Sequence, residues 1–319
     1  MRVTALAGGV GAGKFLRGLV RVVPEEDVTV VVNTGDDITV HGLHVSPDLD
    51  SVTYWLGGVA DRVRGWGRDG ESFRATKELR ALGAEGAWFG LGDLDLATHL
   101  FRTRLLAEGR TLSEATREVT SRFGIGARVL PMTDDSVTTR VEVVDEAGRS
   151  LDLHFQEYWV LRGARDEVKS VRFEGAERAR PAPGILEAIA TAEAVVFCPS
   201  NPIVSIDPIL AVPGVREAVA ARRDRVVAIS PIVGGAPLRG MADRLLPVAG
   251  VDVSAAGVAE HYGGLLGAFV FDHADRDLID RILASCDQGR VADTIMVDDA
   301  AAERLAREAL EVAGGPRVD

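Results

Sequence analysis

The sequence predicts an α/β fold of the Rossmann-like type, with a mostly parallel sheet and helices on both of its faces. Residues 3–7 form a continuous apolar run that leads directly into a glycine-rich segment. Apolar residues then recur at helical spacing as far as Val23, and a second apolar run covers residues 28–32. Short, continuously apolar strands that alternate with helices are typical of a parallel sheet buried on both faces.

Three further apolar runs extend this sheet in the second half of the chain. They cover residues 194–197, 226–229 and 267–271, and each ends at small, polar, Pro or Gly residues. Such boundaries are typical of short buried strands. The last expected element is a helix over residues 300–312, a stretch that is rich in Ala, Glu, Arg and Leu.

The stretch between about residues 52 and 190 has a different pattern. Helical segments are followed by a predicted hairpin, with strands at 139–144 and 151–158 around Glu146-Ala147-Gly148-Arg149. We therefore expect a single domain over residues 1–319. Its core is expected to comprise about residues 1–51 and 191–319, and about residues 52–190 form an inserted helical and hairpin subdomain.

Composition excludes several classes of protein. Of the 319 residues, 46% are hydrophobic, which suffices for a substantial core. The net charge of −12 argues against nucleic-acid binding, because such proteins concentrate positive charge, so any nucleotide partner should be small. The chain has no run of roughly 18 apolar residues and no cleavable leader, so we expect a cytoplasmic protein without a membrane span. Cys198 and Cys286 are expected to be reduced core residues.

The residues after the first predicted strand come within one position of a phosphate-binding P-loop. They read Gly8-Gly9-Val10-Gly11-Ala12-Gly13-Lys14, and a P-loop would continue with a Ser or Thr whose hydroxyl holds Mg²⁺. Phe15 stands there instead and has no hydroxyl. We expect the glycines and the lysine to bind phosphate oxygens at a helix N-terminus, with any metal held by other residues. The alternative is a tight strand-to-helix turn.

Four carboxylates follow the second predicted strand. They lie in Asn33-Thr34-Gly35-Asp36-Asp37 and, shortly afterwards, in Ser46-Pro47-Asp48-Leu49-Asp50. Carboxylate oxygens at the carboxyl edge of a sheet can hold a hard cation, and Mg²⁺ is the natural candidate. The alternative for Asp36 and Asp48 is a role in helix caps or turns, which favour Asp.

Two later loops combine polar groups with Pro or Gly. Ser200 and Asn201 lie between prolines in residues 198–203, and residues 230–237 carry Ser230 and two adjacent glycines. Two such loops on one sheet indicate two phosphoryl-bearing ligands or one long diphosphate, although the first could be a plain proline turn. In the inserted region, residues 90–99 mix apolar residues with carboxylates and His99, as a pocket for a flat polar ring would. A single histidine is more often structural than catalytic.

The chain resembles the 2-phospho-L-lactate transferases in the order and spacing of short motifs along almost its whole length. The pairing of Gly35-Asp36-Asp37 with Ser46-Pro47-Asp48-Leu49-Asp50 is the most specific of these motifs. The others are Ala7-Gly8-Gly9-Val10-Gly11, Val32-Asn33-Thr34, Leu91-Gly92-Asp93, Pro199-Ser200-Asn201-Pro202, Ser230-Pro231-Ile232-Val233-Gly234 and Ala292-Asp293-Thr294.

The resemblance implies an enzyme of deazaflavin coenzyme biosynthesis. It would move a phospholactyl group from lactyl-2-diphospho-5′-guanosine to a hydroxyl of the riboflavin-like precursor Fo, which gives coenzyme F420-0 and GMP. A phosphoenolpyruvyl donor is also open. The resemblance further implies Mg²⁺ as cofactor and a homodimer.

The resemblance also assigns roles to individual residues. Asp50 matches the aspartate at the Fo and metal site, and Asp37 is the expected second carboxylate, so these two are the expected catalytic residues and metal ligands. Asp50 is also the expected proton acceptor, and the two later loops match the guanine-nucleotide region. The expected substrate-binding residues are Gly9, Gly11, Gly13, Lys14, Asn33, Asp48, Gly90, Asp93, Ser200, Asn201, Ser230, Gly234, Gly235 and Asp293.

One departure from the family pattern and two alternative functions accompany this interpretation. Leu94 stands where the family often has arginine, so the contact of that arginine is not expected here. A related branch that binds nucleotide sugars and regulates metabolism shares the glycine loop but usually lacks the Ser-Pro-Asp-Leu-Asp motif, and ranks second. Phe15 disfavours a P-loop nucleotide hydrolase.

Overall fold

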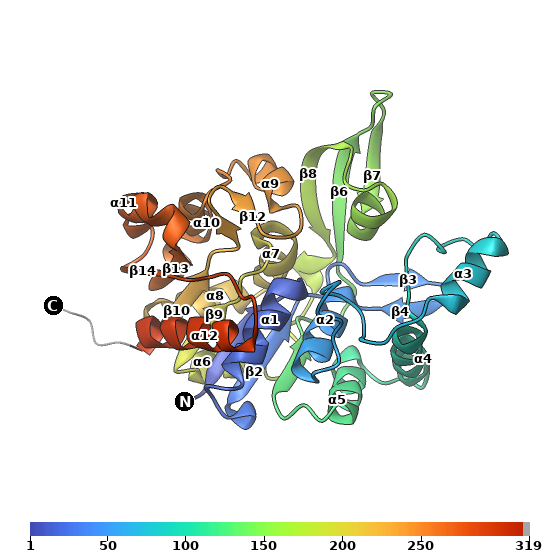
Figure 1. The fold of residues 1–319 in the computed structure, drawn as a ribbon, viewed down its shortest axis with the longest axis horizontal. Coiled ribbons are helices and arrows are strands. Elements are labelled where there is room, and N and C mark those ends of the chain that lie inside the picture. The colour runs from blue at the N-terminus through green and yellow to red at the C-terminus, as the bar shows by residue number, and fades with distance from the viewer. Residues whose placement is uncertain (315–319) are drawn as a thin grey trace.

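Seven parallel strands form the central sheet of the computed structural model, which describes residues 1–314 (Figure 1). The strands lie in the order β14-β13-β10-β9-β1-β2-β5, and every neighbouring pair is parallel. Their bounds are β1 (Val3–Ala7), β2 (Val28–Val32), β5 (Arg128–Pro131), β9 (Ala194–Phe197), β10 (Val226–Ile229), β13 (Ala268–Asp272) and β14 (Gln288–Ala292). The predicted α/β class is confirmed.

The direction in which strands are added reverses between β1 and β9. From β1 the chain adds β2 and β5 on one side, and it then returns to add β9, β10, β13 and β14 on the other. In open α/β sheets, ligands bind outside the carboxyl ends of the strands at such a switch point. The loops that follow β1 and β9 are therefore the first place to look for a site.

Helices cover both faces of the sheet. On one face lie α1 (Gly9–Leu19), α2 (Pro47–Leu56) and α12 (Asp299–Gly314), and α1 packs against both of the others (Figure 1). On the other lie α6 (Ile185–Thr191), α7 (Asp207–Ala211), α8 (Val215–Ala220) and α10 (Ala255–Tyr262). Side chains alternate along a strand, so Ala5 of β1 joins the first core and Leu6 joins the second.

Three smaller sheets surround the central one. The predicted hairpin is present as β6 (Thr138–Val144) and β7 (Ser150–His154), to which β8 (Glu167–Glu174) adds a third antiparallel strand. After His154 the chain becomes helical, so the second strand is shorter than expected. The other two small sheets have two strands each. In one, β3 (Ile38–Val40) pairs with β4 (Leu43–Val45), and in the other, β11 (Ile232–Val233) pairs with β12 (Ala236–Pro237).

The remaining helices are α3 (Arg74–Ala81), α4 (Asp93–Ala107), α5 (Leu112–Arg122), α9 (Ala242–Leu245) and α11 (Ile279–Leu283). Within the range expected as an insertion, β5 pairs with β2 in the central sheet. The division into core and inserted subdomain stays a prediction, and residues 315–319 of the expected core lie outside the described part.

Both cysteines are buried free thiols, and burial raises the pKa of Cys286 to about 11. No helix among residues 1–314 is long and apolar enough to cross a membrane.

The contact between α1 and α12 depends on Gly18. A Cβ atom at this position would lie 2.2 Å from the carbonyl carbon of Ala302 and 2.5 Å from the backbone nitrogen of Glu303. Because both obstacles are backbone, the helices would have to move apart to admit it. We therefore expect Gly18→Ala to lower the free energy of unfolding by about 1–3 kcal/mol or more, measured by urea denaturation.

Gly264→Ala is the matched control for this substitution. A Cβ atom at Gly264 meets nothing within 4 Å, so the expected change is within about 0.5 kcal/mol. Equal stability of the two variants would contradict the close packing of α1 on α12.

Candidate functional site

A cavity of about 1030 Å³ opens at the carboxyl edge of the sheet, beside the switch point. It is lined by the loops after β1, β9, β10 and β14, by α2 and α4, and by residues 64–67 and 155–160. A cavity of this size is at the upper end of the range for small-molecule sites. It can therefore hold more than one substrate.

The loops after β1 and β9 are joined directly to each other. The backbone N–H of Gly8 donates to Ser200 Oγ (3.1 Å), and that hydroxyl donates to the carbonyl oxygen of Gly8 (2.9 Å). A Cβ atom at Gly11 would lie 2.2 Å from the carbonyl oxygen of Pro199, so only glycine fits there. The N-cap residue of α1, Gly8, has no side chain to cap the helix, and Asp48 accepts a hydrogen bond from the backbone N–H of Gly9. The later N–H groups of the first turn are those left for a ligand.

Asn33 gathers the buried acids beneath this loop. Its amide nitrogen donates to Asp48 Oδ2 (2.9 Å) and Asp36 Oδ1 (3.3 Å), and Gln156 donates to Asp36 Oδ2 (2.7 Å). Burial raises the pKa of Asp36 well above its usual value, and the neighbouring charge of Asp48 adds to this effect. Burial also raises the pKa of Asp48, to about 7, although the hydrogen bond from Asn33 opposes the shift.

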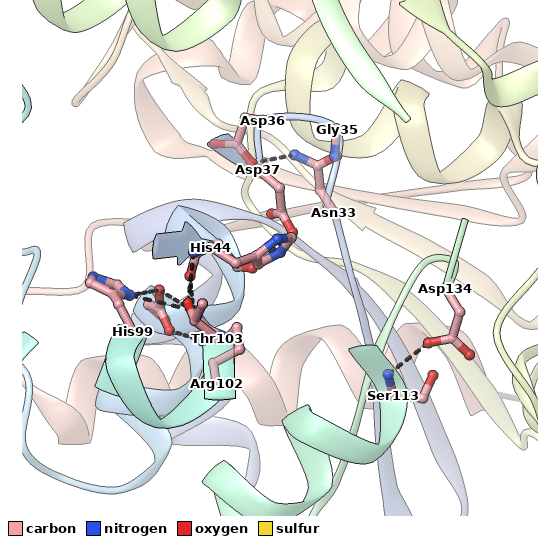
Figure 2. A network of polar contacts seen from close by, with 12 residues as sticks. Asn33, Gly35, Asp36, Asp37, His44, His99, Arg102, Thr103, Ser113 and Asp134 are labelled. Carbon is pink, nitrogen blue, oxygen red and sulfur yellow. Dashed lines mark hydrogen bonds and ion pairs between the residues drawn. The ribbon is translucent and has the colours of Figure 1, made fainter. Parts of the chain in front are cut away.

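Asp37 lies one residue further along, directly before β3. Its Oδ2 accepts hydrogen bonds from His44 Nε2 (2.9 Å) and Ser46 Oγ (2.7 Å), as Figure 2 shows for His44. Its other oxygen, Oδ1, is buried and has no hydrogen-bond partner among residues 1–314. Burial raises the pKa of Asp37, because the hydrogen bond from His44 does not offset the loss of water. An unpartnered buried carboxylate oxygen fits a cation or a donor from a ligand.

Asp50 is paired with a buried arginine. Both terminal nitrogens of Arg102 on α4 donate to the carboxylate, and Arg102 Nη1 lies 3.1 Å from Asp50 Oδ2. Burial by itself would lower the pKa of Arg102, but the charge of Asp50, its hydrogen bonds and the nearby Tyr54 and Asp37 together hold this pKa above its usual value. Next to this pair, Tyr54 donates to Asp95 Oδ1 (2.5 Å), and His99 Nε2 lies 3.2 Å from the same oxygen. The group is nearly inaccessible to solvent.

The structure places the expected metal ligands in different surroundings. One ligand atom each from Asp50, Asp95 and His99 lies within 4.8 Å of the others, so these three could hold a metal ion. Asp37 lies outside this group, beside His44, and the pairing of Asp37 with Asp50 as metal ligands stays a prediction. The sequence analysis included Asp95 within the pocket segment 90–99 but gave it no role of its own, and it did not identify Arg102. Their spacing of i, i+4 and i+7 with His99 would have placed all three on one face of a helix.

Nine of the expected site residues line the cavity. They are Gly9, Gly11, Lys14, Asp48, Asp50, Gly90, Ser200, Asn201 and Ser230. Two of them also make local bonds, because Asn201 Oδ1 accepts from the backbone N–H of Ile203 (3.0 Å) and Ser230 Oγ donates to the carbonyl oxygen of Ile232 (2.8 Å). Asn201 can still offer its amide nitrogen to a ligand. The loop after β10, which contains Ser230, can offer its backbone groups.

Other expected site residues lie outside the lining and have packing or turn roles. A Cβ atom at Gly13 would lie 2.5 Å from the Trp55 ring, so this glycine brings α1 close to α2. Asp93 accepts hydrogen bonds from Ser72 and from the backbone N–H of Ala75 (3.1 Å), at the start of α3 and α4. Asn33 and Asp37, described above, also lie behind the lining.

The remaining three residues lie in exposed turns. Gly234 and Gly235 have φ values of +57° and +81° in the turn between β11 and β12, where the backbone N–H of Gly234 donates to Asp275 Oδ2 (3.0 Å). Asp293 is exposed just after β14, next to Thr294, which does line the cavity. Their roles in substrate binding stay predictions.

Aromatic and basic side chains line the outer part of the cavity. The indole rings of Trp66 and Trp159 are both partly exposed, with 44% and 38% of their surface accessible. The basic side chains are Lys14, Arg64 and Arg239. The cavity lining thus combines buried acids, basic side chains and partly exposed aromatic rings.

Comparison with known proteins gives consistent results. A family model for the 2-phospho-L-lactate transferase CofD matches residues 3–315. The chain is 50% identical over 314 residues to a phosphoenolpyruvate transferase of Streptomyces griseus, covering 98% of each chain. It is 40% identical over 329 residues to a phosphoenolpyruvate transferase of Mycolicibacterium smegmatis, covering 98% of this chain and 99% of that protein. A crystal structure of a UPF0052 family member from Bacillus halodurans has a similar fold, with a TM-score of 0.64 and 16% identity over 97% of this chain and 98% of that one.

The raised pKa of Asp48 makes stability depend on pH. In the unfolded chain this carboxyl has a pKa near 3.8, so between that value and about 7 the folded state binds more protons. Its contribution to stability is therefore complete below about pH 4 and is lost as the pH rises through about 7. We expect Asp48→Asn to be more stable than the wild type at pH 8, by an amount on the order of a few kcal/mol, and to lose this advantage at pH 4.

The measurement is urea denaturation of both proteins in buffer with a chelator of divalent cations. The quantity compared is the difference between the two free energies of unfolding, because other groups titrate in both proteins. A difference that stays constant from pH 4 to pH 8 would contradict the raised pKa.

Proposed function

The chain belongs to the 2-phospho-L-lactate transferase CofD family, and from this premise we propose that it transfers a phosphoenolpyruvyl group to the deazaflavin precursor Fo. The donor is the guanosine diphosphate ester of enolpyruvate, and GMP is released. The observation that carries this choice of donor is the 40% to 50% identity, over nearly the full length, to relatives named phosphoenolpyruvate transferase. The lactyl donor is the alternative that the assay below separates.

The reaction is the attack of a hydroxyl oxygen of Fo on the β-phosphorus of the donor. The bond between this phosphorus and the oxygen that bridges to GMP breaks, and GMP leaves with the electron pair. The hydroxyl proton passes to a carboxylate, for which we propose Asp50. Arg102 orients this carboxylate by two hydrogen bonds, and each carboxylate oxygen keeps a further lone pair that can accept the proton.

The cavity supports the binding of both substrates. Phosphoryl transfer depends mainly on positioning and on neutralisation of charge. The backbone N–H groups at the start of α1 and the loop that holds Ser200 suit the diphosphate. The exposed rings of Trp66 and Trp159 suit the flat ring system of Fo, which would leave its side chain directed toward the acids.

The buried acids fit a divalent cation. Asp37, Asp50 and Asp95 lie around one buried guanidinium, that of Arg102, and Asp36 and Asp48 lie next to Asp37. The unpartnered Asp37 Oδ1 offers a free oxygen ligand. We propose that Asp50 holds Mg²⁺ together with Asp37 or with the neighbouring Asp95. When bound, the ion would neutralise charge on the diphosphate.

Two further properties remain proposals. One is a homodimer, which the resemblance to the family implies and which light scattering coupled to gel filtration would test. The other is a cytoplasmic location, which cell fractionation would test.

The decisive test of the proposed function is turnover. The protein is incubated with Fo, Mg²⁺ and either the enolpyruvyl or the lactyl guanosine diphosphate donor, and the products are identified by mass. We expect the phosphoenolpyruvyl adduct of Fo together with GMP, and a higher kcat/KM for the enolpyruvyl donor. A preference for the lactyl donor would contradict the choice of donor, and the absence of any adduct from both donors would contradict the proposed function.

Asp50→Asn should lower kcat by at least about a hundredfold, because the amide neither accepts the hydroxyl proton nor contributes charge to the cation. It should also weaken the dependence of the rate on Mg²⁺. Because Asp50 compensates the buried Arg102, we expect an additional loss of stability of about 1–3 kcal/mol. Circular dichroism and urea denaturation separate this loss from the change in kcat.

Asp145→Asn is the matched control. Asp145 is also a buried aspartate paired with an arginine, Arg149, but it lies at the tip of the hairpin of β6 and β7 and does not line the cavity. We expect it to retain kcat. A kcat near the wild-type value for Asp50→Asn would remove Asp50 from the proposed mechanism.

A further inference from the structure

Lys14 points into the cavity without an anionic partner. Its ammonium nitrogen lies 3.5 Å from the carbonyl oxygen of Met296 and 5.8 Å from the centre of the Trp55 ring. Among residues 1–314 it forms no ion pair with a carboxylate. It thus retains a full positive charge that the protein itself does not compensate.

Arg239 lines the same cavity from the segment between β12 and α9 and is also without a carboxylate partner among the described residues. Its guanidinium donates to the carbonyl oxygens of Val63 (3.3 Å) and Arg64. Gly65, with a φ of +84°, makes room for it, because a Cβ atom there would lie 2.4 Å from Arg239 Nη1. The two carbonyl groups fix the position of the guanidinium but are neutral, so its charge remains uncompensated.

The two cations lie close enough to influence each other. Burial lowers the pKa of Lys14, and the charge of Arg239 lowers it further. Two like charges that face one cavity without a counter-ion cost free energy, and a bound anion would remove this cost. The cavity lining also includes Asp36, Asp48 and Asp50, but none of them forms an ion pair with Lys14 or Arg239.

We propose that Lys14 and Arg239 together bind an oxyanion of the donor, either on the diphosphate or on the carboxylate of the transferred group. This inference rests on the proposed function. Arginine offers a planar fork that matches two oxygens of a carboxylate or phosphate, and lysine adds a point charge. Arg239 thereby determines specificity for an anionic donor, while the acids that line the cavity are left to the cation and to the hydroxyl of Fo.

The test measures dissociation constants by calorimetry for GDP, inorganic pyrophosphate and guanosine. For Arg239→Gln we expect GDP and pyrophosphate to bind about 10- to 100-fold more weakly, and guanosine to bind as in the wild type. Arg239→Lys, which keeps the charge, should recover most of this loss. Arg216→Gln is the matched control, because Arg216 is an exposed arginine of α8 outside the cavity, and it should leave all three constants unchanged.

The source of the oxyanion is decided by comparing GDP with the complete donor. Weaker binding of GDP by Arg239→Gln assigns the contact to the diphosphate. Unchanged GDP binding together with an increase of about tenfold or more in KM for the enolpyruvyl donor assigns it to the carboxylate. If neither quantity changes, the inference is overturned.

A double variant tests whether the two cations bind the same group. If Lys14 and Arg239 contact one oxyanion, the loss of affinity in Lys14→Met with Arg239→Gln should differ clearly from the product of the two single losses. If the loss of affinity in the double variant equals the product of the two single losses, the shared site is overturned.

Binding requires no turnover, so a wild type that binds GDP without forming the adduct contradicts the proposed function alone. Normal affinity and turnover in Arg239→Gln contradict this inference alone.

Discussion

The direct contact between the loops after β1 and β9 is the constraint on which the site depends. Gly8 and Ser200 are 192 positions apart in the sequence, yet they exchange two hydrogen bonds at the switch point of the sheet. The missing side chain of Gly11 lets the carbonyl oxygen of Pro199 approach the first turn of α1. Because any larger residue would separate these loops, the position of the helix N-terminus relative to the second half of the sheet is fixed by glycine.

The acids beside these loops are buried together because each one is compensated in its own way. A buried carboxylate is costly unless it is neutral, paired or hydrogen-bonded. Each acid has a different solution here, since Asp50 is paired with Arg102 while Asp36 and Asp48 share the amide of Asn33 and have raised pKa values. Lys14 and Arg239, which line the same cavity, have no carboxylate partner among residues 1–314. A hydroxyl acceptor and a metal-bound diphosphate donor can therefore find both acids and cations in one cavity.

The sequence predicted the interior of the sheet better than its edges. The five central strands were predicted because they are buried on both faces and therefore continuously apolar, whereas β5 and β14 are edge strands whose exposed positions carry Arg or Gln. In the site, the glycine loop and the acids after β2 were predicted from local motifs. Asp95 and Arg102 were not, because their contacts with the site depend on how α4 packs against β4, which no short motif encodes.

The central claim is that one cavity at the switch point binds the guanosine diphosphate and the deazaflavin side by side. A crystal structure of the protein with GDP, Fo and Mg²⁺ tests it most directly. The diphosphate should lie against the backbone N–H groups at the start of α1, with the deazaflavin ring beside Trp66 and Trp159 and its hydroxyl directed toward Asp50. A nucleotide bound outside this cavity, or a deazaflavin whose hydroxyl points away from the acids, would contradict the account.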